Sequence, residues 1–222
     1  MHTLLSGIML LMLFSPVTFA AAQELRLVGT GTTTIDDPGV YRAYYGKLSG
    51  EPHVYTFRAD SDVEPVKLVV LVPDVANAKT DISIAMIDGL HPENPFAVAD
   101  GSAIEWTRFF DTAGRDSYLA GPSLEATVPR GTYQIRVWSS NNDSPYVLVV
   151  SGKESFSIGE TLHRYGTLPA IKSQFFGKPG YQAYLAPLLL WPILGVLIIV
   201  GLILFIFMVF FRRRVDENIP VS

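Results

Sequence analysis

The chain has no cysteine among its 222 residues. This absence excludes disulfide bonds, thiol catalysis and thiolate metal sites. It also excludes a lipid-modified cysteine behind an N-terminal apolar segment. Any folded region must therefore rely on an ordinary hydrophobic core. Many exported domains depend on disulfides, so an exported chain without cysteine fits a prokaryotic envelope better than a vertebrate cell surface.

Charged residues are missing from one long segment near the C-terminus. Residues 185–211 contain none, and this run exceeds the roughly 20 apolar residues that span a bilayer. No ionisable side chain interrupts it, which favours a simple anchor over a channel or transporter element. We predict a transmembrane helix over 185–211 and a cytoplasmic tail over 212–222, because arginines favour the cytoplasmic side. The predicted membrane-border residues are Trp191 at the outer interface and Arg212, Arg213 and Arg214 at the inner one.

The N-terminus is also apolar, but its apolar core is short. Leu4–Phe14 cannot span a bilayer, and small residues follow Pro16. These features predict a signal peptide over 1–22, with cleavage after Ala20 or Ala22. A basic residue ahead of the apolar core is lacking, so an uncleaved anchor is the alternative. We expect residues 23–184 to lie outside the cytoplasm.

The region between the two apolar segments is acidic. Residues 23–184 carry 14 lysines and arginines against 19 aspartates and glutamates, a net charge of about −5. Such a surface argues against nucleic acid or anionic lipid as primary partners. We expect the lipid bilayer and a protein of the cell envelope as partners, and no nucleic acid.

Residues 23–152 read as an all-β domain. Short runs rich in β-branched and aromatic residues alternate in polarity or are continuously apolar, and turn clusters separate them. The expected strands are 54–58, 66–72, 81–87, 124–128, 132–138 and 146–150, with weaker ones at 25–28 and 40–48. This spacing predicts a two-layer, antiparallel, jelly-roll-like β-sandwich.

The end of this domain resembles a known module. Gly131–Val137, a polar turn and Tyr146–Val150 are similar to the closing hairpin of pre-peptidase C-terminal (PPC) domains, and Tyr55–Phe57 and Asp81–Ile84 fit the same pattern. The resemblance covers about residues 40–152. It implies a small, appended, non-catalytic β-sandwich, of a kind in which some members bind calcium and some attach to polymers. Such modules usually follow a secreted peptidase, whereas we expect no catalytic domain ahead of this one. The arrangement also resembles membrane-anchored envelope proteins of unassigned role.

Residues 153–184 form a connector with helical features. Ser157 and Glu160 have the spacing of a capping box, and Gly166 can end the helix that they begin. Pro169 can open a second short helix, which Gly177 would stop. We therefore expect two short helices, packed on the sandwich, lying at the membrane interface or docking a partner.

Candidate sites are few. The histidines are dispersed and no hydrolase, metalloprotease or nucleotide-binding motif occurs, so we expect no enzyme, no catalytic residue and no resident cofactor. Asp60, Asp62 and Glu64 alternate along one segment and are weak calcium candidates, since calcium prefers several oxygen ligands. Solvated turn carboxylates explain the same residues. Five aromatic residues could stack on sugars if they shared an exposed face, but in a sandwich of this size such residues are usually core, and we favour packing; they are Trp106, Phe109, Phe110, Tyr118 and Trp138.

Two interpretations of function remain. The first is a membrane-tethered interaction or scaffold module, such as an accessory subunit of an envelope complex. The second is a carbohydrate- or calcium-dependent binding module that faces the cell wall or exterior.

Overall fold

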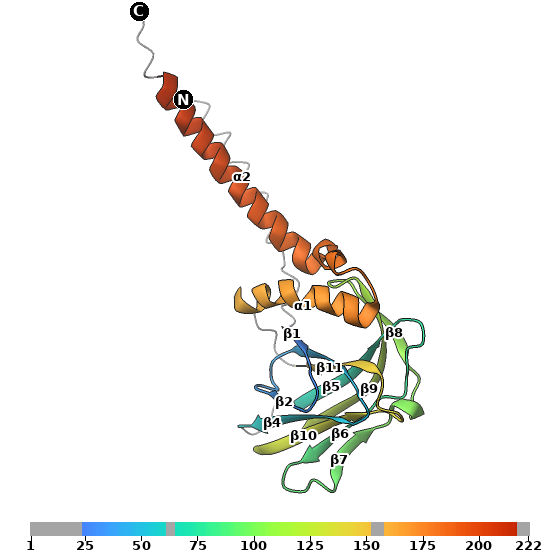
Figure 1. The fold of residues 1–222 in the computed structure, drawn as a ribbon. Coiled ribbons are helices and arrows are strands. Elements are labelled where there is room, and N and C mark those ends of the chain that lie inside the picture. Colours follow the sequence, from blue (N-terminus) through green and yellow to red (C-terminus); the bar gives the residue numbers. More distant parts are fainter. Residues whose placement is uncertain (1–23, 61–64, 152–157, 217–222) are drawn as a thin grey trace, which may run out of the picture.

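The computed structural model describes residues 24–60, 65–151 and 158–216, and the predicted signal peptide lies outside them. Figure 1 shows a β-domain, a helix lying across it and a long helix that extends away. The strands are β1 (Glu24–Leu27), β2 (Thr32–Ile35), β3 (Arg42–Lys47), β4 (His53–Ala59), β5 (Pro65–Pro73), β6 (Ser83–Asp88), β7 (Pro95–Ala99), β8 (Thr107–Asp111), β9 (Asp116–Thr127), β10 (Gly131–Trp138) and β11 (Pro145–Ser151). The helices are α1 (Ile158–Phe176) and α2 (Pro187–Asp216), with short 3₁₀ turns η2 (Gly101–Ala103) and η3 (Gly180–Leu185).

Within the described ranges the strands form two sheets. Sheet A has the order β1-β3-β11-β5-β9-β8, and sheet B has the order β2-β4-β10-β6-β7. The interior pairs are antiparallel, whereas the edge strands β1 and β2 run parallel to β3 and β4. The all-β sandwich is confirmed, with mixed sheets in place of purely antiparallel ones. The parallel pairs arise because the N-terminal segment adds one strand to an edge of each sheet.

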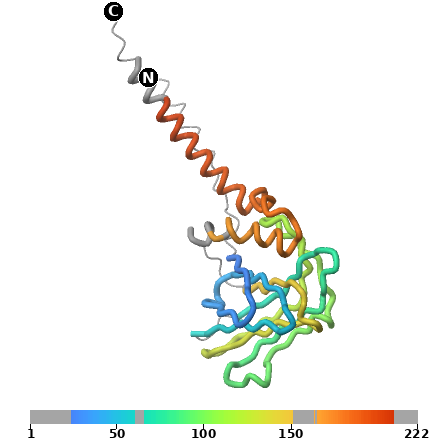
Figure 2. Tube along the Cα trace, viewed as in Figure 1, coloured from blue at the N-terminus to red at the C-terminus, as the bar shows by residue number. Residues whose placement is uncertain are grey.

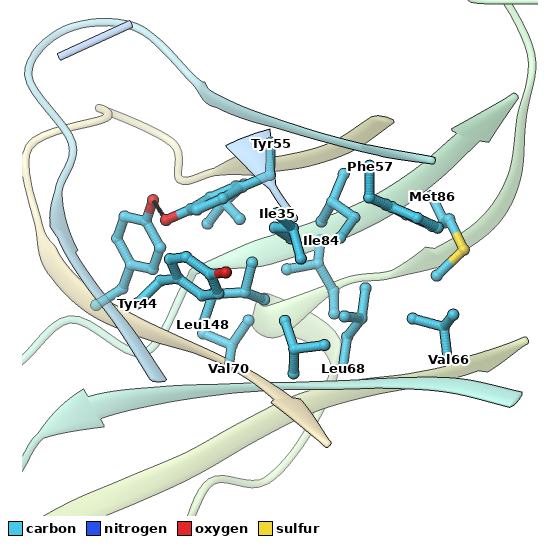
Figure 3. Close-up of a cluster of buried hydrophobic side chains, with 14 of the residues drawn as sticks. Ile35, Tyr44, Tyr55, Phe57, Val66, Leu68, Val70, Ile84, Met86 and Leu148 are labelled. Carbon is cyan, nitrogen blue, oxygen red and sulfur yellow. Dashed lines mark hydrogen bonds between the residues drawn. The ribbon is translucent and has the colours of Figure 1, made fainter. Parts of the chain in front are cut away.

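The first of two cores lies between the sheets, and we call it the sandwich core. It is built by alternation: Tyr133, Ile135 and Val137 of β10 all point inward and are buried. Figure 3 shows Tyr55 and Phe57 of sheet B facing Leu68 and Val70 of sheet A. Strand side chains alternate between faces, so one apolar set per strand suffices to bury this layer.

The second core lies on the opposite face of sheet A, under α1, and we call it the helix–sheet core. Tyr45, Val147 and Val149 point away from the sandwich core and are covered by Leu168 and Ile171 of α1. Strands β3 and β11 are thus buried on both faces, and in β11 this explains the continuous apolar run Tyr146–Val150. The domain therefore has three layers, in the order sheet B, sheet A and α1 (Figure 1).

The connector differs from the two short helices expected. One helix, α1, runs from Ile158 to Phe176 with Pro169 inside it, and only the turn η3 follows. Proline removes one backbone donor, but the carbonyl of Tyr165 that loses it accepts a hydrogen bond from the Tyr184 hydroxyl at 3.5 Å. Packing of the apolar side of α1 against sheet A outweighs the cost of the proline. Gly177 ends the helix at a positive φ of 61°.

Helix α2 begins at Pro187, close to the start of the expected membrane segment. Its stretch Pro187–Met208, 22 residues long, is apolar enough to cross a membrane, and within the described residues it is the one helix that meets this criterion. Trp191 lies in its first turns with 58% of its surface exposed. Arg212, Arg213 and Arg214 lie within its last turns. In the tube view of Figure 2, α2 leaves from the α1 side, away from both sheets.

Candidate functional site

The outer face of sheet B is an uncovered sheet surface. Because Tyr133, Ile135 and Val137 of β10 point into the sandwich core, Arg136 and Trp138 must point outward. No described helix lies on this face, in contrast to the outer face of sheet A (Figure 1). It is therefore the larger sheet surface that the described chain leaves open to a partner.

A groove of about 370 Å³ lies along this face. Ala85 and Ile87 of β6 contribute to its lining, and the loop before β7 adds Pro92 and Pro95. Arg136 and Glu93 add one charge of each sign. The groove is apolar along its length and polar at these two points, a composition that suits recognition of a partner's side chains.

A second groove of about 320 Å³ adjoins the first and is more polar. Asp81, Asp100 and three serines line it, and Trp138 borders both grooves. Asp81 Oδ2 accepts hydrogen bonds from the backbone amide of Ser140, at 3.1 Å, and from the Ser140 hydroxyl. Asp81 Oδ1 is shielded from solvent and has no hydrogen-bond partner among the described residues.

Asp100 is held in place beside this groove. Its Oδ1 accepts hydrogen bonds from the backbone amide of Ser102 at 2.8 Å and from the Ser102 hydroxyl at 2.7 Å. These bonds stabilise the ionised carboxylate and lower the pKa of Asp100. The second groove therefore carries an ordered negative charge at neutral pH.

His53 is buried, although it is the first residue of β4. It is 5% exposed, and its Nδ1 lies 2.7 Å from the hydroxyl of Tyr146, which lies 2.7 Å from the hydroxyl of Tyr55. Gly46 makes room for this group, since a Cβ there would lie 2.8 Å from the Tyr146 ring. Burial lowers the pKa of His53. Because the three side chains are buried and hydrogen bonds join them, the geometry of the cluster suits a structural role within the sandwich core.

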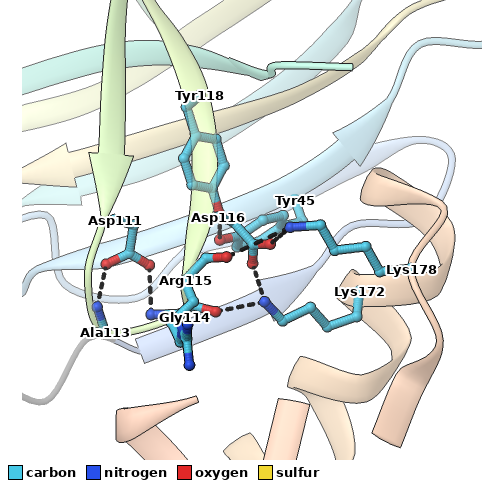
Figure 4. Close-up of polar contacts among 9 residues, drawn as sticks. All are labelled: Tyr45, Asp111, Ala113, Gly114, Arg115, Asp116, Tyr118, Lys172 and Lys178. Carbon is cyan, nitrogen blue, oxygen red and sulfur yellow. Dashed lines mark hydrogen bonds and ion pairs between the residues drawn. The ribbon is translucent and has the colours of Figure 1, made fainter. Parts of the chain in front are cut away.

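A second polar cluster joins the sandwich to the connector (Figure 4). Asp116 is 1% exposed, and its two carboxylate oxygens accept from Lys172 Nζ at 2.6 Å and Lys178 Nζ at 2.8 Å. Lys172 is itself 2% exposed and also donates to the carbonyl of Gly114 at 2.5 Å. The backbone amide of Leu188, in the first turn of α2, donates to Ala113 at 3.2 Å. The tip of the β8–β9 hairpin is thus tied to α1, to the loop that follows α1 and to α2.

The neighbouring hydroxyls extend this junction into the helix–sheet core. The hydroxyls of Tyr45 and Tyr118 lie 2.8 Å apart, and burial raises the pKa of both. Tyr118 contacts Phe176 edge to face, and Lys178 lies 5.3 Å from the centre of that ring. The sequence shows Lys172 and Lys178 only as dispersed charges. Their pairing depends on Asp116, which lies 56 and 62 residues earlier, and no local pattern indicates it.

The predicted calcium ligands are not brought together by the described part of the chain. Asp60 is exposed and pairs with Arg58 at 2.9 Å, while Asp62 and Glu64 lie outside the described residues. Across residues 24–60, 65–151 and 158–216, no three acidic, histidine or cysteine side chains gather in a way that could hold a metal. Calcium binding at Asp60, Asp62 and Glu64 stays a prediction.

The large aromatic residues do not share one face. Trp106 packs beside the sandwich core and donates to the carbonyl of Gly101 at 2.8 Å, and Tyr118 belongs to the helix–sheet core. Phe109 and Phe110 are half exposed on β8, at the edge of sheet A. Trp138 alone among these five candidates lies beside the grooves of sheet B.

Comparison with known proteins finds likeness in fold only. No protein-family model matches the sequence, and no curated protein matches it. The chain is similar to the pre-peptidase C-terminal domain of a Bacillus anthracis collagenase, with 14% identity and a TM-score of 0.33 over 53% of this chain and 91% of that one. It is also similar to PliG of Aeromonas hydrophila, a periplasmic inhibitor of g-type lysozyme, with 11% identity and a TM-score of 0.37 over 57% and 97%. CorA of Methylomicrobium album, a surface-associated copper-binding protein, has 10% identity and a TM-score of 0.31 over 58% and 100%.

A PPC domain is thus among the solved structures that this β-sandwich resembles, in agreement with the resemblance of its closing hairpin.

Proposed function

We propose that the protein is a non-catalytic binding module, tethered to a membrane by α2, that holds a partner protein of the cell envelope on the outer face of sheet B. The observation that carries this proposal is the placement of its two surfaces. Sheet A is covered by α1 and joined to α2, whereas sheet B, with both grooves, lies on the side of the domain away from α2 (Figures 1 and 2).

The junction at Asp116 supports a fixed presentation of that face. A flexible linker would let the sandwich rotate freely about its anchor. Here the β8–β9 hairpin bonds to Lys172, Lys178 and the first turn of α2, so the membrane helix and the sandwich meet at a buried, hydrogen-bonded contact. Such a module presents sheet B at a defined distance from the bilayer, as an accessory subunit of an envelope complex must.

The proposed orientation places residues 24–186 outside the cytoplasm and the end of α2 inside. It is supported by the three arginines in the last turns of α2, because basic residues favour the cytoplasmic side. Protease added to intact spheroplasts should remove the sandwich and spare a C-terminal tag. Loss of the tag before the sandwich would contradict this orientation.

The direct test of the partner uses the full-length protein in its native membranes. After solubilisation in mild detergent, wild-type protein should retain a partner that Arg136→Glu and Trp138→Ala lose. Thr34→Ala is the matched control, since Thr34 is exposed on β2 in the same sheet but does not line either groove. Equal retention by all four proteins, or none by wild type, would refute the proposal for this face.

Carbohydrate binding is the second candidate, and the polar groove favours it. Trp138 offers a ring on which a sugar can stack, and Asp100 is an exposed, ordered carboxylate that can accept from a sugar hydroxyl. Isolated wall polymer should then bind the wild-type protein, and Asp100→Asn should weaken binding more than Arg136→Glu does. Chelation of calcium separates a calcium-dependent mode from a calcium-independent one. Binding to polymer that is insensitive to substitution of Asp100 and Trp138 would exclude this groove.

A further inference from the structure

Among the edges of the two sheets, β8 is the one left open to another strand. β1 is tied down by the buried Glu24, which pairs with Arg42, and β7 begins with a proline and has an irregular register against β6. β2 is rich in threonine. Prolines, bulges and polar residues are the features by which natural edge strands avoid pairing with other chains.

β8 has few of these protections. It pairs with β9 in regular register and closes the order of sheet A, so its other side has no strand beside it in the described chain. Residues 107–110 are all exposed, and Phe109 and Phe110 have 49% and 53% of their surface accessible. Arg108 is 73% exposed and pairs with Asp74 at the rim. A regular, exposed strand with two adjacent phenylalanines is a template for strand addition.

We propose that β8 pairs with β8 of a second copy of this chain, antiparallel, so that two A sheets form one continuous sheet across a two-fold axis. This inference rests on the tether of the proposed function but not on the ligand of sheet B.

Symmetry argues for a second copy as the occupant. Two identical strands that pair antiparallel with the same face up are related by a two-fold axis perpendicular to the sheet. Because α1 lies on one face of sheet A, this axis keeps both α1 helices, and both α2 helices, on the same side of the joined sheet (Figure 1). Two copies anchored in one bilayer need that arrangement. Confinement to the membrane also raises their effective concentration, so a short interface can suffice.

The side chains select one register. In a same-face pair the axis passes midway between the two copies of one residue, and these two copies lie directly opposite each other. An axis at Arg108 would set two arginines against each other, which is unfavourable. An axis at Phe109 sets Phe109 against itself and Arg108 against Phe110 of the second copy, an arrangement that permits two cation–π contacts. The same register sets Thr107 against the Asp111 carboxylate of the second copy. Avoidance of the arginine–arginine pair, together with these contacts, therefore favours the Phe109-centred register.

Disulfide mapping tests this register in native membranes, because the full-length chain has no cysteine of its own. Phe109→Cys should form a covalent dimer on mild oxidation, since directly opposite Cβ atoms lie about 4.5–5.5 Å apart. Arg108→Cys and Phe110→Cys should each fail alone, because each lies one residue from the axis and is therefore two residues out of register with its own copy. They should cross-link to one another when the two variants are co-expressed. Thr34→Cys on β2 and Val98→Cys on β7 are exposed controls that should remain monomeric.

A lysine variant tests the same interface without cross-linking, and its circular dichroism spectrum shows whether the domain still folds. Phe109→Lys sets two like charges against each other and should reduce the dimer seen by light scattering in detergent by at least tenfold, with an unchanged circular dichroism spectrum. Val98→Lys should not change it. Cross-linking at every position including the controls, no cross-link at any β8 position, or an adduct with a different protein in place of the dimer would each overturn the proposal.

Discussion

The two cores of this protein are built by different rules. The sandwich core joins strands whose apolar residues alternate, so the local sequence of each strand determines which of its side chains are buried. The helix–sheet core joins one face of β11 and of β3, a strand far earlier in the chain, to α1, and at its edge lies a buried aspartate between two lysines. The first core is specified locally, whereas the second depends on groups that meet only after the sandwich has formed.

This contrast bears on function. The sandwich core determines that sheet B exists, and the helix–sheet core determines how that sheet is held relative to α2. Damage to the first should remove the domain. Damage to the second should leave a folded domain on a loosened tether, which would bind its partner but present it in no fixed position. The two cores can therefore be separated by experiment.

The largest expected effect falls on the junction of the second core. Asp116→Ala leaves Lys172 buried without its carboxylate, and breaking a buried pair in this way costs about 3–5 kcal/mol. We expect α1 to detach while the sheets persist. Hydrogen exchange on the full-length protein in detergent should show faster exchange over 165–176 and unchanged protection in β10. Combining Asp116→Leu with Lys172→Met should restore much of the protection, because no buried charge then lacks a partner. Global unfolding by Asp116→Ala would show that the two cores are one cooperative unit.

The next effect compares one buried isoleucine from each core. Ile135 and Ile171 are both 0% exposed, and truncation of either to alanine should cost about 2–5 kcal/mol. Ile135→Ala should lower the midpoint of urea unfolding measured by the far-ultraviolet β signal. Ile171→Ala should leave that midpoint nearly unchanged and speed proteolysis of α1. If both variants shift the same transition by the same amount, the proposed independence of the cores is wrong.

The same contrast explains which strands the sequence predicts and which it does not. The strands of the sandwich core were predictable because their alternation or continuous apolar character is local, and β4, β5, β10 and β11 lie where it indicates. β8 was missed because its exposed residues show no burial pattern, and β2 was missed because a threonine run resembles a polar linker. Strand β9 begins eight residues before its predicted start, since Gly121 and Pro122 look like a turn.

The candidate site was harder to predict for the same physical reason. Trp138 was recognisable as a possible ligand platform, but its neighbours Asp81 and Asp100 come from other parts of the chain and meet it only in the folded sheet. Lys172 and Lys178 looked like flanking charges because their shared partner is remote. Alternation predicts which face a residue lies on. It does not predict which remote residue will lie beside it.

The smallest expected effect concerns the pH dependence of stability, and it tests His53, the buried histidine of the sandwich core. Burial lowers the pKa of His53 below its unfolded value of about 6.5. As the pH falls below about 6.5, His53 binds a proton in the unfolded chain but stays neutral in the folded chain. The free energy of unfolding contributed by His53 is therefore complete above that pH and is lost as the pH falls towards the folded pKa. Urea unfolding measured between about pH 5 and pH 8 should show stability declining on the acid side.

His53→Gln, which can still hydrogen-bond to Tyr146, should show a smaller decline, because glutamine does not titrate. If the variant and the wild type lose stability in parallel, other groups control the acid sensitivity, and the sandwich core is not where the pH dependence of this fold originates.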